Sequence, residues 1–287
     1  MAVHEAALLQ PLLVRRRART PLGLSATVGL AILVVLVLMW IWGVVAPPRN
    51  PLATDAASQL LPPGSGHLLG TDKYGRDVLS RIMAGAGIDL AIAIAVTGVA
   101  FTVGVLIGSF AGFRGGWVDD VVLRVVDMVL SFPAFVLALA ITAVLGNSIR
   151  NVIIAIAVAY TPYFVRLARG EVLSARRSDY ADNARAVGNP GWRIVLLHLL
   201  PNCLTPALVQ ASLTMGWSIL DASGLSFLGL GIKPPTPEWG VEVSDGASNI
   251  VSGEWWTSVF PGLTITLAVL AFNLIGGAIQ SRFSRRA

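Results

Sequence analysis

The chain has 287 residues, of which 13% are charged and 55% are hydrophobic, and its formal net charge is +5. Soluble domains carry about 25% charged residues, and several uncharged runs here exceed the roughly 18 residues that indicate a membrane span. The low charge and the long apolar runs exclude a soluble domain and a disordered chain. Because the chain has 1 cysteine, a secreted scaffold held by internal disulfides is also excluded. The composition predicts an all-α integral membrane protein.

Six apolar segments lie between the charged residues. They cover residues 20–48, 90–113, 128–149, 151–165, 194–220 and 255–281. The fourth has only 15 residues, so its helix must extend into its flanks or place the flanking arginines at the interface. Before the third segment, Arg124 and Asp127 have the i, i+3 spacing of an ion pair. We therefore predict six transmembrane helices.

These segments divide the chain into successive parts. We expect a cytoplasmic tail over residues 1–20, a first membrane helix over 21–46, an extracytoplasmic loop over 47–88, a core of five further spans over 89–281 with an inner loop over 166–193, and a cytoplasmic tail over 282–287. The first apolar run is too long for a signal peptide, whose apolar region has about 7–15 residues. It is therefore expected to remain as an uncleaved helix.

The basic residues predict the orientation of the chain. With the N-terminus inside the cell, 15 of the 21 Lys and Arg residues fall in inner segments and 6 in outer segments. Because cytoplasmic loops of membrane proteins are enriched in Lys and Arg, this division predicts a multi-pass protein of a prokaryotic cell membrane with both termini in the cytoplasm. The arginines are thus explained by topology, and no nucleic-acid partner is expected.

The residues of an enzyme or of an ion-driven carrier are missing from the sequence. The histidines, His4, His67 and His198, lack metal-ligand spacing, and neither Lys73 nor Lys233 belongs to a glycine-rich phosphate loop. We therefore expect no catalytic residue, no metal and no cofactor bound by this chain. Carboxylates are nearly missing from the spans, which weakens a proton-driven carrier, although an ion site lined by the backbone of a broken helix would escape this test.

The inner loop over residues 166–193 contains the signals of a short helix. Ser178 can cap its start, and Gly188 can close it in a left-handed conformation. An apolar stripe is predicted at i, i+4 and i+7, formed by Tyr180, Ala184 and Val187. Because so short a helix is unstable alone, it must dock on the membrane surface, on its own chain or on a cytoplasmic partner.

The same loop carries a recognisable motif. It reads Asp182-Asn183-Ala184-x-x-x-Gly188 and, after nine residues, His198-x-Leu200-Pro201. This pattern resembles the E-A-A-x-x-x-G-x9-I-x-L-P loop of ATP-binding-cassette importer permeases, from which Asp182, Asn183 and His198 depart. Two further stretches, over residues 67–81 and 224–240, resemble the dipeptide, oligopeptide and nickel branch of that family.

The resemblance implies a fold of six transmembrane helices with a cytoplasmic coupling helix. It implies the pore subunit of an ATP-driven importer for dipeptides, oligopeptides or related small solutes. Besides the lipid bilayer, the implied partners are a homologous second permease, two cytoplasmic ATP-binding subunits that use ATP and Mg, and an extracytoplasmic substrate-binding protein. The residues implied to couple the chain to the ATPase are Asp182, Asn183, Ala184, Arg185, Val187, Gly188, Leu200 and Pro201.

The outer surface and the substrate path have their own candidates. Those of the outer surface are Asp72, Arg76, Asp77, Glu238 and Trp239. The first three are expected to form local caps and ion pairs, with direct contact to the binding protein or the solute as the alternative. The proline-rich segment around Trp239 is expected to make its loop rigid. Asp221 is the acidic residue within a span that is best placed to bind a peptide amine.

Two other functions stay open at this point. A secondary transporter would need an ion site and internal repeats, neither of which is evident in the sequence, and a membrane scaffold would need no pore. The sequence does not distinguish a dipeptide from a longer peptide, a D-amino-acid dipeptide, glutathione or a nickel chelate as the solute.

Overall fold

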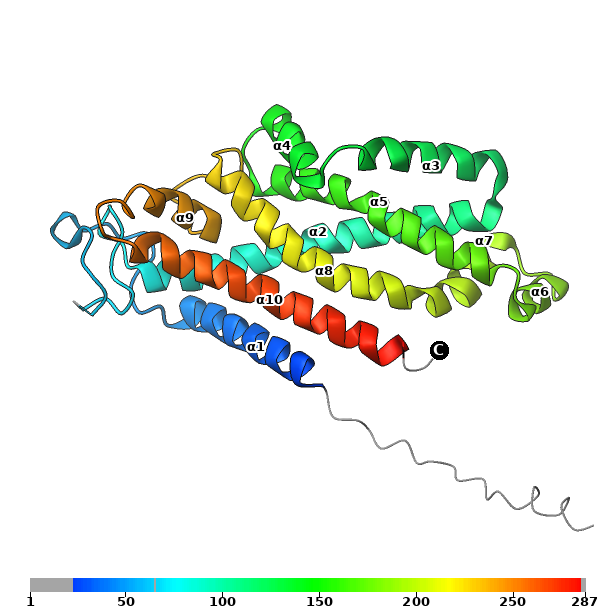
Figure 1. Ribbon diagram of the computed structural model, residues 1–287, viewed down its shortest axis with the longest axis horizontal. Coiled ribbons are helices and arrows are strands. Elements are labelled where there is room, and N and C mark those ends of the chain that lie inside the picture. Colours follow the sequence, from blue (N-terminus) through cyan, green and yellow to red (C-terminus); the bar gives the residue numbers. More distant parts are fainter. Residues whose placement is uncertain (1–22, 65, 285–287) are drawn as a thin grey trace, which may run out of the picture.

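The computed structural model describes residues 23–64 and 66–284, and within them the regular structure is helical (Figure 1). The helices are α1 (Leu24–Val45), α2 (Val78–Arg114), α3 (Gly116–Leu130), α4 (Ala134–Leu145), α5 (Ile149–Ala175), α6 (Asp179–Ala186), α7 (Gly191–Arg193), α8 (Leu200–Phe227), α9 (Trp239–Ala247) and α10 (Trp256–Ser284). A 3₁₀ turn over Ala56–Ser58 and a π-helical turn over Ile194–Leu199 complete them.

Five of these helices, α1, α2, α5, α8 and α10, are long and apolar enough to cross a membrane. The pair α3 and α4 qualifies when taken together, although the two helices meet at an angle of 86°. They therefore make six crossings if the bent pair spans the membrane once. The continuous apolar segment expected to cross over residues 128–149 is broken at Pro133, because a proline disfavours a helical conformation in the residue before it.

Two helices extend beyond the apolar segments that predicted them. α2 begins at Val78, within the residues assigned to the outer loop, because the Asp77 carboxylate accepts a hydrogen bond from the Ser80 amide at 2.8 Å. α5 continues to Ala175, within the residues assigned to the inner loop. Residues 1–20 of the expected N-terminal tail and 285–287 of the C-terminal tail lie outside the described residues.

The ion pair expected between Arg124 and Asp127 is wrong. Asp127 instead pairs with Arg166 of α5 at 2.6 Å, and Arg169 forms a two-point bond with Asp119 at 2.6 and 2.7 Å. Two carboxylates of α3, those of Asp119 and Asp127, therefore face α5. This pairing explains how α5 continues through two arginines, since each finds a carboxylate on the neighbouring helix.

The helices form an elongated bundle with two distinct ends (Figure 1). α2 runs through the bundle beside α5 and α8, while α1 and α10 lie along one side and the bent pair α3 and α4 along another. The connection over residues 46–77 gathers with α9 at one end, which we call the outer end. α6 and α7 lie at the opposite, inner end, toward which α1 begins and α10 ends.

Three glycines of α2 allow its backbone to touch the backbone of α5. Gly104, Gly108 and Gly112 recur every four residues, and so they share one face of the helix. A Cβ atom would lie 2.7 Å from the Thr161 carbonyl oxygen at Gly104 and 2.7 Å from the Arg169 carbonyl oxygen at Gly112, and at Gly108 it would collide with the Val165 carbonyl. Small residues of this spacing permit close helix packing in membranes.

We predict opposite effects for one added methyl group at two glycines of α2. Gly108→Ala should lower the free energy of unfolding by about 1–3 kcal/mol, because the Cβ atom meets the α5 backbone and overpacks the contact. Gly98→Ala is the matched control, since no atom lies within 4 Å of its Cβ position, and the better helix propensity of alanine should leave stability unchanged or raised. Thermal melting in detergent measures both, and equal melting temperatures would contradict the contact.

Candidate functional site

At the inner end, α6 docks on its own chain. Its buried residues Ala181 and Ala184 join a cluster contributed by α5, α8 and the segment between α6 and α8. The other members are Val172, Ile194, Leu199 and Cys203, with Phe113 and Ala175 packed against them. The helix is therefore held by apolar contacts to the ends of α2, α5 and α8.

The predicted apolar stripe of α6 is wrong in two of its three positions. Ala184 is buried, but Val187 is 82% exposed and Tyr180 is 41% exposed. Val187 is off the stripe because α6 ends at Ala186, so this residue lies beyond the helix. The buried face is instead made by Ala181 and Ala184, which are three residues apart and small enough for close docking.

The ends of α6 follow the sequence prediction only in part. Gly188 has φ of +81°, in agreement with the predicted left-handed closure. Ser178 stands at the N-cap position, but its hydroxyl donates to the Ala175 carbonyl oxygen at 2.6 Å and makes no capping bond to α6. Asp179 and Asp182 in the first turn supply the negative charge that a helix N-terminus favours.

The candidate coupling residues divide into exposed and buried ones. Asp182, Asn183, Arg185, Val187 and Gly188 are exposed around α6, and Asp182 pairs with Arg185 at 2.6 Å. Ala184 is buried and holds the helix in place. Leu200 and Pro201 lie after the π-helical turn at the start of α8, where Leu200 packs against the central core and Pro201 is exposed.

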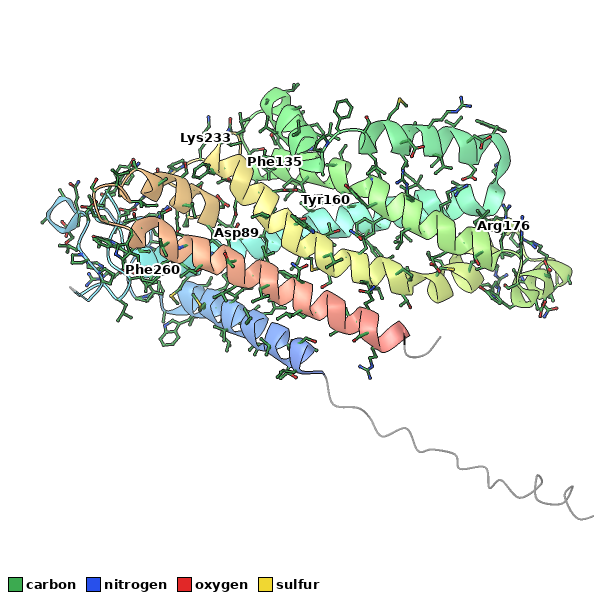
Figure 2. All side chains as sticks on the ribbon, in the orientation of Figure 1. Asp89, Phe135, Tyr160, Arg176, Lys233 and Phe260 are labelled. Carbon is green, nitrogen blue, oxygen red and sulfur yellow. The ribbon has the colours of Figure 1, made fainter. Side chains whose placement is uncertain are left out.

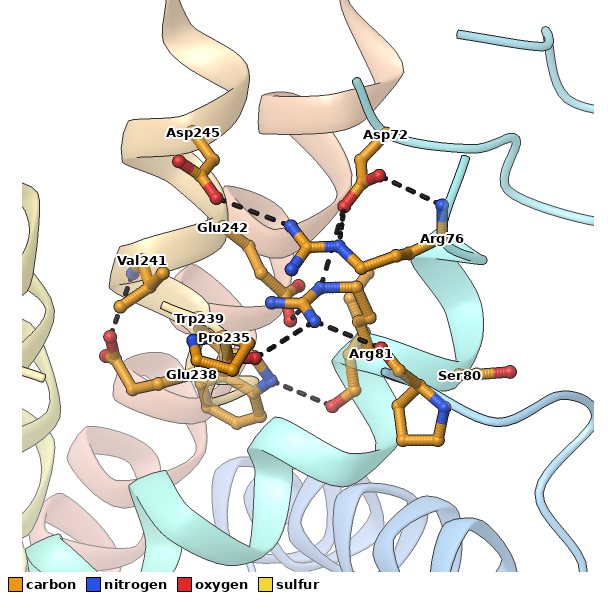
Figure 3. Close-up of polar contacts among 12 residues, drawn as sticks. Asp72, Arg76, Ser80, Arg81, Pro235, Glu238, Trp239, Val241, Glu242 and Asp245 are labelled. Atoms are coloured by element: carbon orange, nitrogen blue, oxygen red, sulfur yellow. Dashed lines mark hydrogen bonds and ion pairs between the residues drawn. The ribbon is translucent and has the colours of Figure 1, made fainter. Parts of the chain in front are cut away.

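At the outer end, buried charges join the first connection to α9 (Figure 3). Arg76 bonds to Asp72 at 2.5 Å and lies 3.4 Å from Asp245. Arg81, only 2% exposed, lies 3.7 Å from Glu242 and 3.8 Å from Asp72 and donates to the carbonyl oxygens of residues 51 and 235 at 3.1 and 3.3 Å. We call Asp72, Arg76, Arg81, Glu242 and Asp245 the outer cluster.

The other outer candidates also make internal contacts. Asp77 caps α2 and lies 2.8 Å from the Nδ1 atom of His67. Glu238 caps α9 by accepting from the amides of residues 240 and 241 at 3.0 and 2.8 Å. Trp239 is fully buried, and its indole donates to the carbonyl oxygen of Ile82 at 3.0 Å. Trp239 therefore holds α9 on α2, and all three side chains are buried and are not part of an exposed surface of this chain.

Sequence reasoning missed three buried charged residues of this region, namely Arg81, Asp89 and Glu242. Asp89 lies within α2, fully buried, and accepts a hydrogen bond from the Trp239 amide at 3.2 Å (Figure 2). It directly precedes the apolar run that begins at residue 90, and a carboxylate at the edge of a span gives no sign of burial. Its burial depends on the contact with Trp239, which is distant in the sequence.

The candidate for the substrate path, Asp221, lies at the contact between α8 and α5. Its carboxylate accepts a hydrogen bond from the hydroxyl of Tyr160, at 2.9 Å, and both residues are buried. An amine of a solute could reach this carboxylate only where the two helices separate or the tyrosine turns away.

The part of the chain that the structure describes holds no group of three or more His, Cys, Asp or Glu side chains that could bind a metal ion. The expectation that this chain binds no metal and no cofactor stays a prediction.

We predict that stability falls with rising pH because of Glu242. Burial raises the pKa of this carboxyl from 4.5 to about 8, against the opposing effect of Arg81. The folded chain therefore keeps a proton that the unfolded chain loses near pH 4.5, so the stabilisation present below that pH is lost as the pH rises to about 8. Melting temperatures should decline from pH 5 to pH 8, and Glu242→Gln should flatten the decline.

Asp55→Asn serves as the control for this experiment. Hydrogen bonds from Ser58 and Ala57 lower the pKa of the exposed Asp55 carboxyl, so it does not titrate in this range and its substitution should leave the slope unchanged. A Glu242→Gln variant with the slope of the starting protein would contradict the assignment.

Comparison with known proteins identifies the family. Residues 104–287 match the family described as binding-protein-dependent transport system inner membrane component. The probable D,D-dipeptide transport system permease protein DdpC of Escherichia coli (strain K12) is 39% identical, covering 92% of this chain and 89% of the relative. The dipeptide transport system permease protein DppC of Alkalihalophilus pseudofirmus is 42% identical over 89% and 84%, and the glutathione transport system permease protein GsiD of Pectobacterium atrosepticum is 40% identical over 76% and 72%. The chain belongs to the family of binding-protein-dependent transport system inner membrane components.

Proposed function

We propose that this chain is the membrane-spanning pore subunit of an ATP-driven importer for dipeptides, oligopeptides or related small solutes, and that its partner ATPase acts on α6. Like its relatives, the chain is a permease subunit and not an enzyme. The observation that carries the proposal is the docking of α6 at the inner end. One side of this short helix is exposed, and its buried side is fixed to the ends of three membrane helices.

The implied partners follow from what the chain lacks. Its sequence has no phosphate-binding loop, so an ATP-driven importer built on this chain would take its energy from separate ATP-binding subunits, which would use ATP and Mg. We propose two such subunits, a homologous second permease and an extracytoplasmic substrate-binding protein as partners. The relatives named as dipeptide and glutathione permeases support a peptide-like solute.

The orientation belongs to the same proposal. The inner end carries α6 with Arg176, Arg177 and Arg185, whereas the outer end carries the acidic residues of α9. Since positive residues are retained in the cytoplasm, we place the inner end and both termini there. The outer end then faces the binding protein, and Asp221 lies between the two as a candidate contact for a peptide amine.

The two alternative functions are weakened by separate observations. A secondary transporter has no ATPase to bind, so it would not need a docked helix with an exposed charged side at the inner end. A scaffold without a pore is disfavoured by the family, whose members are transport components.

We predict that a charge at the exposed end of α6 will disrupt binding of the ATPase. Val187→Asp replaces an apolar side chain that is 82% exposed with a carboxylate. It should therefore weaken the interface with the ATPase without affecting the fold. Co-purification of the ATP-binding subunits with the tagged permease should fall several-fold, about the effect of one charge buried unpaired at an interface.

Val251→Asp is the matched control, because Val251 is 94% exposed and follows α9 at the outer end. It should leave co-purification unchanged. Equal recovery of the ATP-binding subunits with both variants would remove α6 as their contact.

A further inference from the structure

The inner end of α2 is capped by the side chain of an arginine that directly follows α5. The last carbonyl groups of a helix have no partner within it, and they form the negative end of its dipole. Arg176, the residue that follows α5, donates from its Nη1 atom to the carbonyl oxygens of Gly112 at 2.9 Å and Phe113 at 3.2 Å. One guanidinium thus joins the end of α5 to the end of α2 (Figure 2).

The same arginine is bonded to α6. The Nη2 atom of Arg185 donates to the carbonyl oxygen of Arg176 at 3.1 Å, and its guanidinium lies 5.6 Å from the centroid of the Phe113 ring. Phe113 packs against the apolar cluster that holds Ala181 and Ala184 of α6. Polar and apolar contacts therefore link α6 to the last turn of α2.

α2 is suited to carry a displacement from one end of the molecule to the other. It has 37 residues, which corresponds to a length of about 55 Å, and its sequence contains no proline, whereas α5, α8 and α10 contain Pro162, Pro206 and Pro261. At its opposite end, Asp77 contacts His67 of the connection over residues 46–77, and Arg81 lies near Glu242 of α9. A proline-free helix is thus anchored at both ends by side-chain contacts.

We propose that Arg176 is a positioning residue that fixes α6 to α2, so that a movement of α6 imposed by the ATPase is passed along α2 to the outer cluster. The proposal rests on the proposed function of the chain. It assigns to α2 the transmission between the two ends, and to the Arg176 side chain the hydrogen bonds that make α6 and the last turn of α2 move together.

The test compares two neighbouring arginines. Arg177 is exposed and forms no side-chain hydrogen bond to any described residue, so Arg177→Ala removes the same charge without removing the bonds to α2. Arg176→Lys keeps the charge but loses the planar fork of donors, and it guards against a failure of Arg176→Ala to fold.

Two measurements on these variants separate the proposal from the proposed function. Spin labels at Ile107 of α2 and at Val187, both exposed, report the spread of distances between α2 and α6 in the permease alone. In the reconstituted complex with its ATP-binding subunits and binding protein, the ratio of solute-stimulated to basal ATP hydrolysis reports coupling.

We expect Arg176→Ala to widen the distance distribution and to lower the stimulation ratio at least about fivefold, the lower range of coupling between sites. Arg176→Lys should give values between those of Arg176→Ala and the starting protein. Arg177→Ala should match the starting protein in both measurements. Equal results for Arg176→Ala and Arg177→Ala would overturn the proposal, as would a wider distribution with unchanged stimulation. A starting complex without solute-stimulated hydrolysis would contradict the proposed function, while the spin labels alone would still decide whether Arg176 fixes α6.

Discussion

The backbone contact between α2 and α5 holds together the two helices that lead to opposite ends of the molecule. Apolar burial gives little attraction between helices in lipid, since the lipid tails are equally apolar, so helices associate through close packing and polar bonds. Gly104, Gly108 and Gly112 let the backbones of α2 and α5 meet. Because α5 leads directly into α6 and α2 reaches the outer end, this contact fixes the relation between the two functional ends of the molecule.

Each end is then held by polar bonds of a kind that suits its surroundings. At the outer end, Arg81 and Glu242 are buried 3.7 Å apart, and a buried guanidinium is costly unless it has partners. Their partners come from separate segments, so the outer connection and α9 are tied to α2. At the inner end, the charges are mostly exposed, and the buried face of α6 is made of alanines. The outer end is thus built internally, whereas α6 leaves its charged side free for a partner.

The sequence was sufficient to predict the features with a local signal. Uncharged runs predicted the spans, and Gly188 predicted the end of the short inner helix, because hydropathy and a left-handed glycine are properties of consecutive residues. The partners of charged residues were not predictable in this way. Asp127 bonds to Arg166, which is 39 residues away, and not to the nearby Arg124. The buried face of α6 depends on where the helix ends, which places Val187 beyond it, and the partner of Asp89 is the amide of Trp239, which is 150 residues away.

We propose that α6 receives the movement of an ATPase and shares it with α2. Structures of the assembled transporter with and without bound nucleotide would show this movement. We expect α6 to contact an ATP-binding subunit in both states. We also expect α6 and the last turn of α2 to move together, with the bonds from Arg176 to the carbonyl oxygens of Gly112 and Phe113 intact. An α6 that contacts no ATP-binding subunit, or that moves while α2 stays in place, would contradict it.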